Sequence, residues 1–151
     1  MAELVWALRK AEVAVAARKE QGLRKVGMAP AHFSLLMAIS RQPGLTGAEM
    51  ARRLNVTPQA VASLVARLEG KGQLERRPHP RHGHVQELHL TEAGRDALQA
   101  AKPVVAEIER KLRRDLGSAE ADRLAAMLDR VAEVVKDDRD LPRRTAAAEQ
   151  P

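Results

Sequence analysis

The chain has 151 residues, a net charge of +6 and 44% hydrophobic residues, which allows one domain with helical extensions and a substantial core. The absence of cysteine excludes disulfides, thiol-based redox sensing and cysteine metal sites. No apolar run could serve as the core of a signal peptide or cross a bilayer, so we expect a cytoplasmic protein without a membrane partner.

The first part of the chain predicts two helices. Residues 2–22 are rich in alanine and carry apolar side chains on two stripes, one of which contains Trp6 and Val13. A helix that is apolar on two sides needs partners on both of them. After a glycine-containing loop, Pro30 is suited to the first turn of a second helix over 30–40.

Two short helices joined by a tight turn are expected next. Thr46 and Glu49 have capping-box spacing, in which a hydroxyl and a carboxylate bond each other's free amide groups at a helix start. Thr57 can cap the following helix, which should end at Gly70 or Gly72. This arrangement predicts a helix-turn-helix.

The second helix of this pair has two unlike sides. Its apolar side repeats at helical spacing and should be buried in a core: Val61, Leu64, Val65 and Leu68. Its other side carries almost no bulk: Gln59, Ala60, Ala62, Ser63 and Ala66. A helix this small on its outer side can approach a partner closely.

The rest of the chain predicts a hairpin and further helices. Residues 73–91 alternate apolar and polar side chains on both sides of a turn, as a two-stranded hairpin does. Thr91 should cap a long helix, which Pro103 either kinks or divides into two helices. Ser118 should cap the last helix, and the tail over 138–151 should be weakly ordered.

Positive charge is concentrated around the helix-turn-helix. Between Arg52 and Arg81 there are seven basic and two acidic residues, so this segment holds five of the six net positive charges. Such clustering is typical of a surface that binds phosphates, although arginine can also simply solvate an alanine-rich protein. Nucleic acid is therefore the expected partner.

Four sequence motifs between Leu45 and Leu98 occur together: "LTGAEMARRL", "VTPQAV", "LEGKGQLERRP" and "LTEAG". In combination they closely resemble the core of the MarR family of bacterial winged-helix transcription regulators. The resemblance implies a mainly α fold with a small β-hairpin wing. Residues 30–91 would form the winged helix-turn-helix, and residues 1–29 and 92–137 would form dimerisation helices. It also implies a homodimer on double-stranded DNA, with a near-palindromic operator, and a small-molecule effector.

The chain departs from the pattern of that family at two places. Many members carry a hydroxyl residue followed by arginine where this chain has Ala62 and Ser63, so base reading should be weaker or differently placed. Many members also carry Asp and Arg in the wing where this chain has His82 and Gly83. Arg81 is the expected substitute for the missing arginine.

Candidate DNA contacts fall into two groups. Gln59 can bond both edge groups of adenine and lies four residues from Ser63 on one side of the helix. The base-reading candidates are Thr57, Gln59, Ala60 and Ser63. Most protein contacts to DNA go to the backbone. The phosphate and wing candidates are Arg52, Arg53, Arg67, Lys71, Arg76, Arg77, Arg81, His82 and His84.

Two further sites are considered. An aliphatic ligand pocket would be lined by Trp6, Val13, His32, Leu36 and Met37, although His32 could instead be a packing residue. Histidines crowd the wing and could bind zinc loosely, whereas a structural zinc site needs four fixed ligands. These histidines are His79, His82, His84 and His89.

The main hypothesis is a dimeric, sequence-specific transcription regulator, in the simplest case a repressor, that a small molecule releases from DNA. One alternative is a metal-responsive regulator that uses the wing histidines. The other is an architectural protein that coats DNA without an effector. The chain has no phosphate-binding glycine loop, no G-x-S-x-G turn and no H-E-x-x-H helix, so neither an enzyme nor a cofactor is expected.

Overall fold

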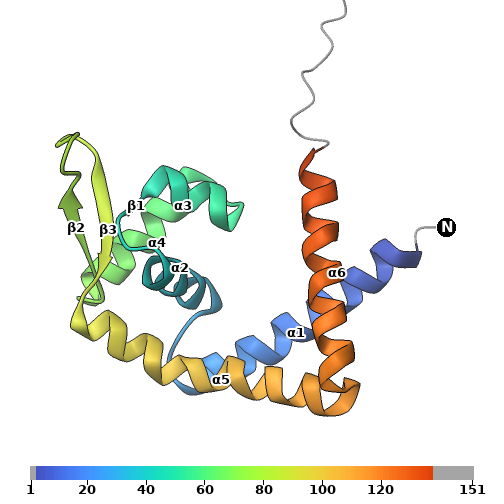
Figure 1. Ribbon diagram of the computed structural model, residues 1–151. Helices are drawn as coiled ribbons and strands as arrows, with labels where there is room; N and C mark the ends of the chain where they lie inside the picture. Colours follow the sequence, from blue (N-terminus) through green and yellow to red (C-terminus); the bar gives the residue numbers. More distant parts are fainter. Residues whose placement is uncertain (1–2, 138–151) are drawn as a thin grey trace, which may run out of the picture. The chain divides into compact units, whose positions relative to one another are not determined.

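The computed structural model describes residues 3–137, which form six helices and three short strands (Figure 1). The helices are α1 (Glu3–Lys25), α2 (Pro30–Arg41), α3 (Gly47–Leu54), α4 (Pro58–Gly70), α5 (Glu92–Leu116) and α6 (Ser118–Asp137). The strands are β1 (Leu45–Thr46), β2 (Leu74–Pro78) and β3 (Gln86–Leu90). They form an antiparallel sheet in the order β1-β3-β2. The chain divides within α5, after Ile108, into two compact units.

The helix-turn-helix forms as the sequence predicts, because α3 and α4 begin at the expected caps. The amide of Glu49 donates to Thr46 Oγ1 at 3.2 Å and the amide of Thr46 donates to Glu49 Oε2 at 2.7 Å, which completes the capping box. The Thr46 amide, followed by the Thr46 hydroxyl, which donates to Glu49 Oε2 at 3.0 Å, lowers the pKa of the Glu49 carboxyl. Thr57 caps α4 by accepting the amide of Ala60 at 3.1 Å. Asn55 joins the two helices in a left-handed conformation.

The sheet has a third strand that the sequence pattern does not predict. Strand β1 pairs with β3 through Leu45 opposite Leu88 and Thr46 opposite Glu87, so the hairpin is part of a three-stranded sheet. Two residues are too few for an alternating pattern to stand out in a sequence. The first helix also differs from the prediction, because α1 continues to Lys25.

Of the two alternatives for Pro103, the division into two helices is wrong, and the cap assigned to Ser118 is wrong as well. Helix α5 runs unbroken through Pro103, so the proline does not divide it into two helices. Proline removes one amide donor, to the carbonyl of Gln99, and water can bond that carbonyl because Gln99 is exposed. Ser118 is the first residue of α6 and not its cap, because Gly117 precedes it with a φ of +89°.

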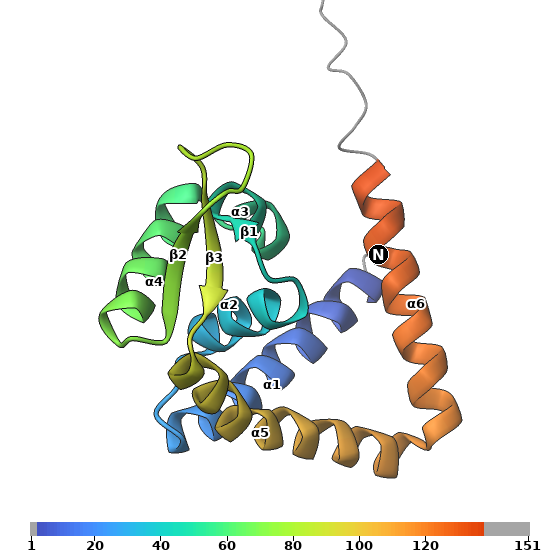
Figure 2. The same ribbon diagram turned by 60° about the vertical axis from the view of Figure 1, so that its left-hand side comes forward.

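The core lies in the first unit, where helices cover one face of the sheet. In Figure 1 helices α2, α3 and α4 all lie on the same side of β2 and β3, and Figure 2 shows α4 to the left of these strands and α2 and α3 largely to their right. Leu74, Leu88 and Leu90 are the buried side chains of β2 and β3. The largest fully buried side chains are Leu23, Leu35, Leu36, Ile39, Met50, Val61, Leu68 and Leu98.

Gly94 shows why the "LTEAG" motif ends in glycine. A Cβ atom at this position would lie 1.9 Å from the carbonyl oxygen of Gln73, which is too close for any side chain. The neighbouring Thr91 accepts the amide of Gly94 at 3.1 Å and donates its hydroxyl to the carbonyl of Gly72. The start of α5 is thereby held against the loop that follows α4.

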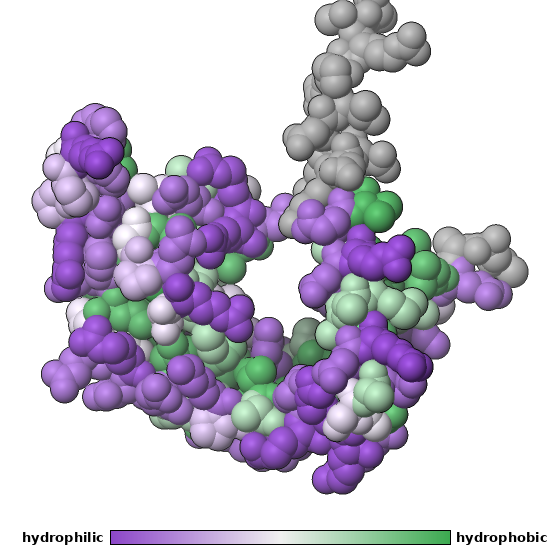
Figure 3. Space-filling view, viewed as in Figure 1, coloured by the Kyte–Doolittle hydropathy of each residue, from purple (hydrophilic) through white to green (hydrophobic). Residues whose placement is uncertain are grey.

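Helix α6 contrasts with this core, because none of its described side chains is buried. Met127 is 61% exposed and Val134 is 68% exposed. Hydrophobic surface is visible along this helix in Figure 3. The apolar positions repeat at helical spacing: Leu124, Met127, Leu128, Val131 and Val135.

Candidate nucleic-acid interface

Helix α4 has the two unlike sides that its sequence predicts. Val61, Val65 and Leu68 are buried in the core and Leu64 packs against it. The small residues on the other side are all exposed: Gln59, Ala60, Ala62, Ser63 and Ala66. The helix is therefore anchored by one side and offers a flat surface on the other.

The N-terminal half of this exposed side carries the polar groups. Gln59 and Ser63 make no side-chain hydrogen bond to any described residue, so their donors and acceptors are free for a ligand. The hydroxyl of Thr57 accepts the amide of Ala60, so this hydroxyl caps the helix. Free amide groups at a helix start favour a phosphate, because the helix dipole is positive there.

The basic candidates separate into paired and unpaired side chains. Arg76 bonds Glu69 at 3.1 Å, Arg77 bonds Glu75, and Arg53 bonds Gln42. The remaining four have no hydrogen-bond or ion-pair partner for the side chain among the described residues and are exposed: Arg52, Arg67, Lys71 and Arg81. These four cations can meet phosphates without first breaking a bond within the protein.

Strand alternation separates the two adjacent arginines of β2. Arg76 lies opposite Leu88 and bonds Glu69 of α4, so it is on the side of the sheet that faces the helices. Arg77 lies opposite Glu87 and therefore points to the other side. The sequence-based prediction assigns both arginines to phosphate and does not distinguish them. The alternating pattern that predicts the strand also places Arg76 and Arg77 on opposite sides of the sheet.

The wing loop is organised by His79. Its Nδ1 atom accepts the backbone amides of Arg81 at 3.1 Å and of His82 at 3.2 Å, so its ring proton is on Nε2. The ring stacks on that of His82, with 5.2 Å between the centroids, and His84 meets His82 edge to face. Arg81 is thus presented on an ordered turn.

The wing histidines do not assemble a metal site. No group of three or more His, Asp or Glu side chains in residues 3–137 is placed to hold a metal ion. His89 instead bonds Glu87 at 3.0 Å, and His79 lies 3.8 Å from the same carboxylate. The metal-responsive alternative therefore gains no support from the described residues.

The residues predicted to line a ligand pocket are not brought together in one chain. Leu36 is fully buried, Met37 is partly buried, and Trp6 and Val13 are 66% and 48% exposed on α1. His32 is nearly buried, and burial, followed by the charges of Lys71 and Arg67, lowers its pKa. The predicted pocket stays a prediction.

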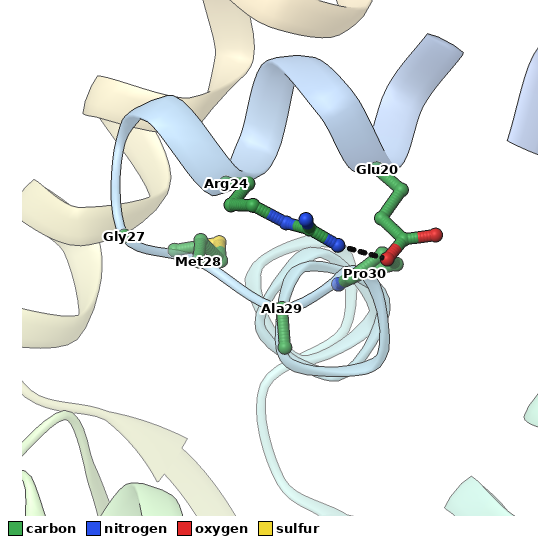
Figure 4. A pocket seen from close by; sticks show the side chains of 6 residues that line it. All are labelled: Glu20, Arg24, Gly27, Met28, Ala29 and Pro30. Atoms are coloured by element: carbon green, nitrogen blue, oxygen red, sulfur yellow. Dashed lines mark hydrogen bonds and ion pairs between the residues drawn. The ribbon is translucent and has the colours of Figure 1, made fainter. Parts of the chain in front are cut away.

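A different hollow of about 330 Å³ lies where α1 meets α2. Figure 4 shows Glu20 and Arg24 on the last turns of α1, joined by a bond of 2.8 Å, above Met28 and Pro30. The hollow combines a charged pair with apolar side chains. It shares no residue with the predicted pocket.

The α3–α4 pair followed by the β2–β3 hairpin defines a winged helix-turn-helix protein. A family model described as "MarR family" matches residues 26–83. The chain is 32% identical to the transcriptional repressor CouR, whose structure bound to a 23-mer DNA duplex has a TM-score of 0.79 and is matched over 92% of its length and 85% of this chain. This chain belongs to the MarR family.

Two further similarities extend this finding. A structure of CouR bound to p-coumaroyl-CoA has a TM-score of 0.74, with 32% identity over 85% of this chain and 91% of that one. The HTH-type transcriptional repressor Rv2887 of Mycobacterium tuberculosis is 35% identical over 83 residues. That match covers 55% of this chain and 60% of the relative, so the chain spans less than two thirds of the length of such curated relatives. In the described part of the chain no helix is both long and apolar enough to span a membrane.

Proposed function

We propose that the protein is a dimeric transcriptional repressor that binds a near-palindromic DNA site and is released by a small molecule. The observation that carries this proposal is the exposed, small outer side of α4, held on the domain by a buried apolar side. The DNA-bound structure of CouR supports it. A repressor of chromosomal genes would act in the cytoplasm.

The outer side of α4 suits the major groove. Small side chains allow the backbone to come close to the bases, so that the short Ser63 and the amide of Gln59 can reach base edges. Thr57 and Ala60 would lie at the start of the helix, next to a phosphate. The four unpaired cations would bind the backbone on both sides, with Arg81 on the wing.

Dimerisation is supported by apolar surface that one chain leaves exposed. On α1, Leu4, Val5 and Trp6 are each about two thirds exposed, and α6 carries its own exposed stripe. Monomeric proteins rarely expose contiguous apolar patches of this kind. A second copy that contributes the same surfaces would bury them in a symmetric interface.

The proposed effector is a small molecule, and the CouR complex with p-coumaroyl-CoA supports a CoA thioester as the first class to test. The predicted pocket of Trp6, Val13, His32, Leu36 and Met37 would then have to form between two chains, because α1 is exposed in one chain. Adding p-coumaroyl-CoA to the protein–DNA complex, with free CoA as the control, tests this step. Release by the thioester alone is the expected result.

The DNA-reading role is tested with two kinds of variant on a footprinted site and on a scrambled duplex. Gln59→Ala should weaken binding to the site by about 1 to 3 kcal/mol and leave random DNA almost unaffected, as expected for a base reader. Arg67→Ala should weaken both duplexes alike and reduce the salt slope by about 0.9 for each phosphate that the variant no longer neutralises. Arg114→Ala, an exposed arginine of α5, is the control.

The same measurement distinguishes the architectural alternative. A coating protein would give no discrete footprint, and Gln59→Ala would then weaken both duplexes equally. That result would refute sequence-specific reading by α4.

A further inference from the structure

The loop at the tip of the wing, residues 79–85, is closed by hydrogen bonds at both of its ends. The amide of His79 donates to the carbonyl of Val85 at 2.8 Å, and the amide of Val85 donates to the carbonyl of His82 at 2.8 Å. The His79 ring adds the two bonds that it accepts from the amides of Arg81 and His82. A single side chain therefore holds the first half of the loop.

His79 acts in this loop as a cap does at the start of a helix. A helix cap accepts an amide of the second or third residue after it, and proline is common directly after the cap. Thr57 does so at the start of α4, where it accepts the Ala60 amide and Pro58 follows. His79 is followed by Pro80 and accepts the amides of the second and third residues after it. The same arrangement thus recurs in the wing with an imidazole as the acceptor.

An imidazole differs from the usual capping groups because a proton can remove its acceptor. A hydroxyl or an amide oxygen accepts hydrogen bonds at any ordinary pH, whereas a protonated imidazole has a donor on each nitrogen. Histidine changes its charge between about pH 5 and 8. A proton on Nδ1 of His79 would point at two amide donors, so both bonds would be lost.

Charged groups from both strands of the wing face this ring. Its Nε2 atom lies 3.8 Å from Glu87, but Glu87 bonds His89 at the shorter distance of 3.0 Å. Arg77 lies opposite Glu87 and two residues before His79, hence on the same side of the sheet. A carboxylate favours a charged ring and cations oppose it, whereas the two amides bond only to an unprotonated Nδ1. The described charged and titratable groups around the ring are Glu87, His89, Arg77, Arg81, His82 and His84.

From these contacts we propose that His79 is a positioning residue of the wing, whose unprotonated Nδ1 atom holds Arg81 in the direction of the DNA backbone. The proposal rests on the proposed function, in which Arg81 contacts a phosphate. The guanidinium of Arg81 is exposed and has no partner among residues 3–137, so its direction depends on the backbone that His79 fixes. Protonation of His79 would release this contact and leave α4 in place, because buried side chains hold that helix.

Ring-nitrogen and amide spectra of the free, full chain test the geometry without DNA. At about pH 8 the His79 ring should carry its proton on Nε2, and at about pH 5 the amide signals of Arg81 and His82 should move to positions typical of an unbonded loop. In His79→Asn these signals should keep their bonded positions, since the asparagine oxygen accepts nearby amides in an Asx turn and does not titrate. Bonded amides at both pH values in the parent chain would overturn the proposal.

DNA binding tests whether the turn positions Arg81. On the footprinted site at about pH 8, Arg81→Ala should weaken binding about tenfold, because a charge-assisted bond to phosphate is lost. His79→Phe should weaken it by a similar factor, since phenylalanine keeps a ring to stack on His82 but has no acceptor. His79→Asn should bind like the parent chain. Both variants at this position lose the contact with Glu87, so only the acceptor differs between them.

The cost of Arg81→Ala at two pH values gives the most direct comparison. In the parent chain the loss of affinity should fall from about tenfold at about pH 8 to about twofold at about pH 5, because the protonated ring no longer holds the turn. In the His79→Asn background the loss should be the same at both pH values. The other histidines are present in both backgrounds, so their protonation cancels in the comparison.

Two results of the DNA measurements would overturn the proposal. One is an equal loss from Arg81→Ala at both pH values in the parent chain, and the other is His79→Asn that binds as weakly as His79→Phe. Either result would leave sequence-specific reading by α4 intact. The spectra of the free chain need no DNA, so they test the positioning by His79 even if the proposed function fails.

Discussion

The winged helix and α6 are both rich in apolar side chains, but the winged helix buries them and α6 does not. Leu35, Leu36, Met50 and Leu68 are fully buried in the first unit, whereas Met127 and Val134 are more than 60% exposed on α6. The winged helix thus obtains its stability from contacts within one chain. Helix α6 has an apolar stripe that requires another surface, and we propose that a second copy supplies it.

The largest expected effect comes from placing a charge on the α6 stripe. Leu128→Asp should raise the dimer dissociation constant about a thousandfold, or about 4 kcal/mol, because a symmetric interface contains the substitution twice and buries both charges. Sedimentation at micromolar protein measures the change. Asp129→Ala, on the opposite side of the helix, should leave the dimer intact.

Loss of the dimer in Leu128→Asp can be assigned to the α6 stripe only if the winged helix remains folded in this variant. The amide signals of residues 30–91 should match those of the parent chain. An unchanged dimer in Leu128→Asp would show that the α6 stripe is not the interface.

Gly94→Ala should destabilise the first unit and leave the α6 stripe unchanged. The added Cβ would meet the Gln73 carbonyl at 1.9 Å, so the backbone must shift, and we expect a decrease of about 3 kcal/mol in the free energy of unfolding. Urea denaturation measures it. Gly70→Ala is the matched control, because a Cβ there meets nothing within 4 Å and alanine favours a helix. Equal stability of the two variants would contradict this account of the motif.

Thr46→Ala tests the capping box at the start of α3. Removing the hydroxyl leaves the Glu49 amide without its bond at 3.2 Å, and the cost should be about 1 kcal/mol. Thr46→Ser should retain most of that stability. A decrease that is the same for both variants would point to packing of the methyl group in place of capping.

The smallest expected effect is the contribution of His32 to the pH dependence of the free energy of unfolding. Burial lowers its folded-state pKa, so its contribution to stability is full above the unfolded value of about 6.5 and is lost as the pH falls through the folded value. Unfolding free energy measured between pH 7.5 and 5 should fall less steeply in His32→Gln than in the parent chain. Identical slopes would show that His32 protonates equally in both states.

Local chemistry explains what the sequence could predict. The capping residues Thr46, Thr57 and Thr91 act within three residues of themselves, so spacing alone located the starts of α3, α4 and α5. The two sides of α4 follow from its helical period, and the exposed outer side confirms them. The DNA contacts assigned to that side remain predictions.

What the sequence could not predict depends on distant contacts. The need for glycine at 94 comes from the Gln73 carbonyl, and β1 exists only because Leu45 meets Leu88 far along the chain. No spacing rule connects these pairs.

Half-site spacing tests the central claim most directly, since a dimer would present two α4 helices about one DNA turn, or roughly 10 base pairs, apart. Inserting about 5 base pairs between the half-sites of the footprinted operator turns one half-site to the opposite face of the duplex. We expect the affinity of the parent chain to fall about a hundredfold or more, since the second half-site can no longer be engaged at the same time. The Leu128→Asp variant should be insensitive to the insertion. Equal affinity of the parent chain for both duplexes would contradict a dimer that reads DNA with two α4 helices.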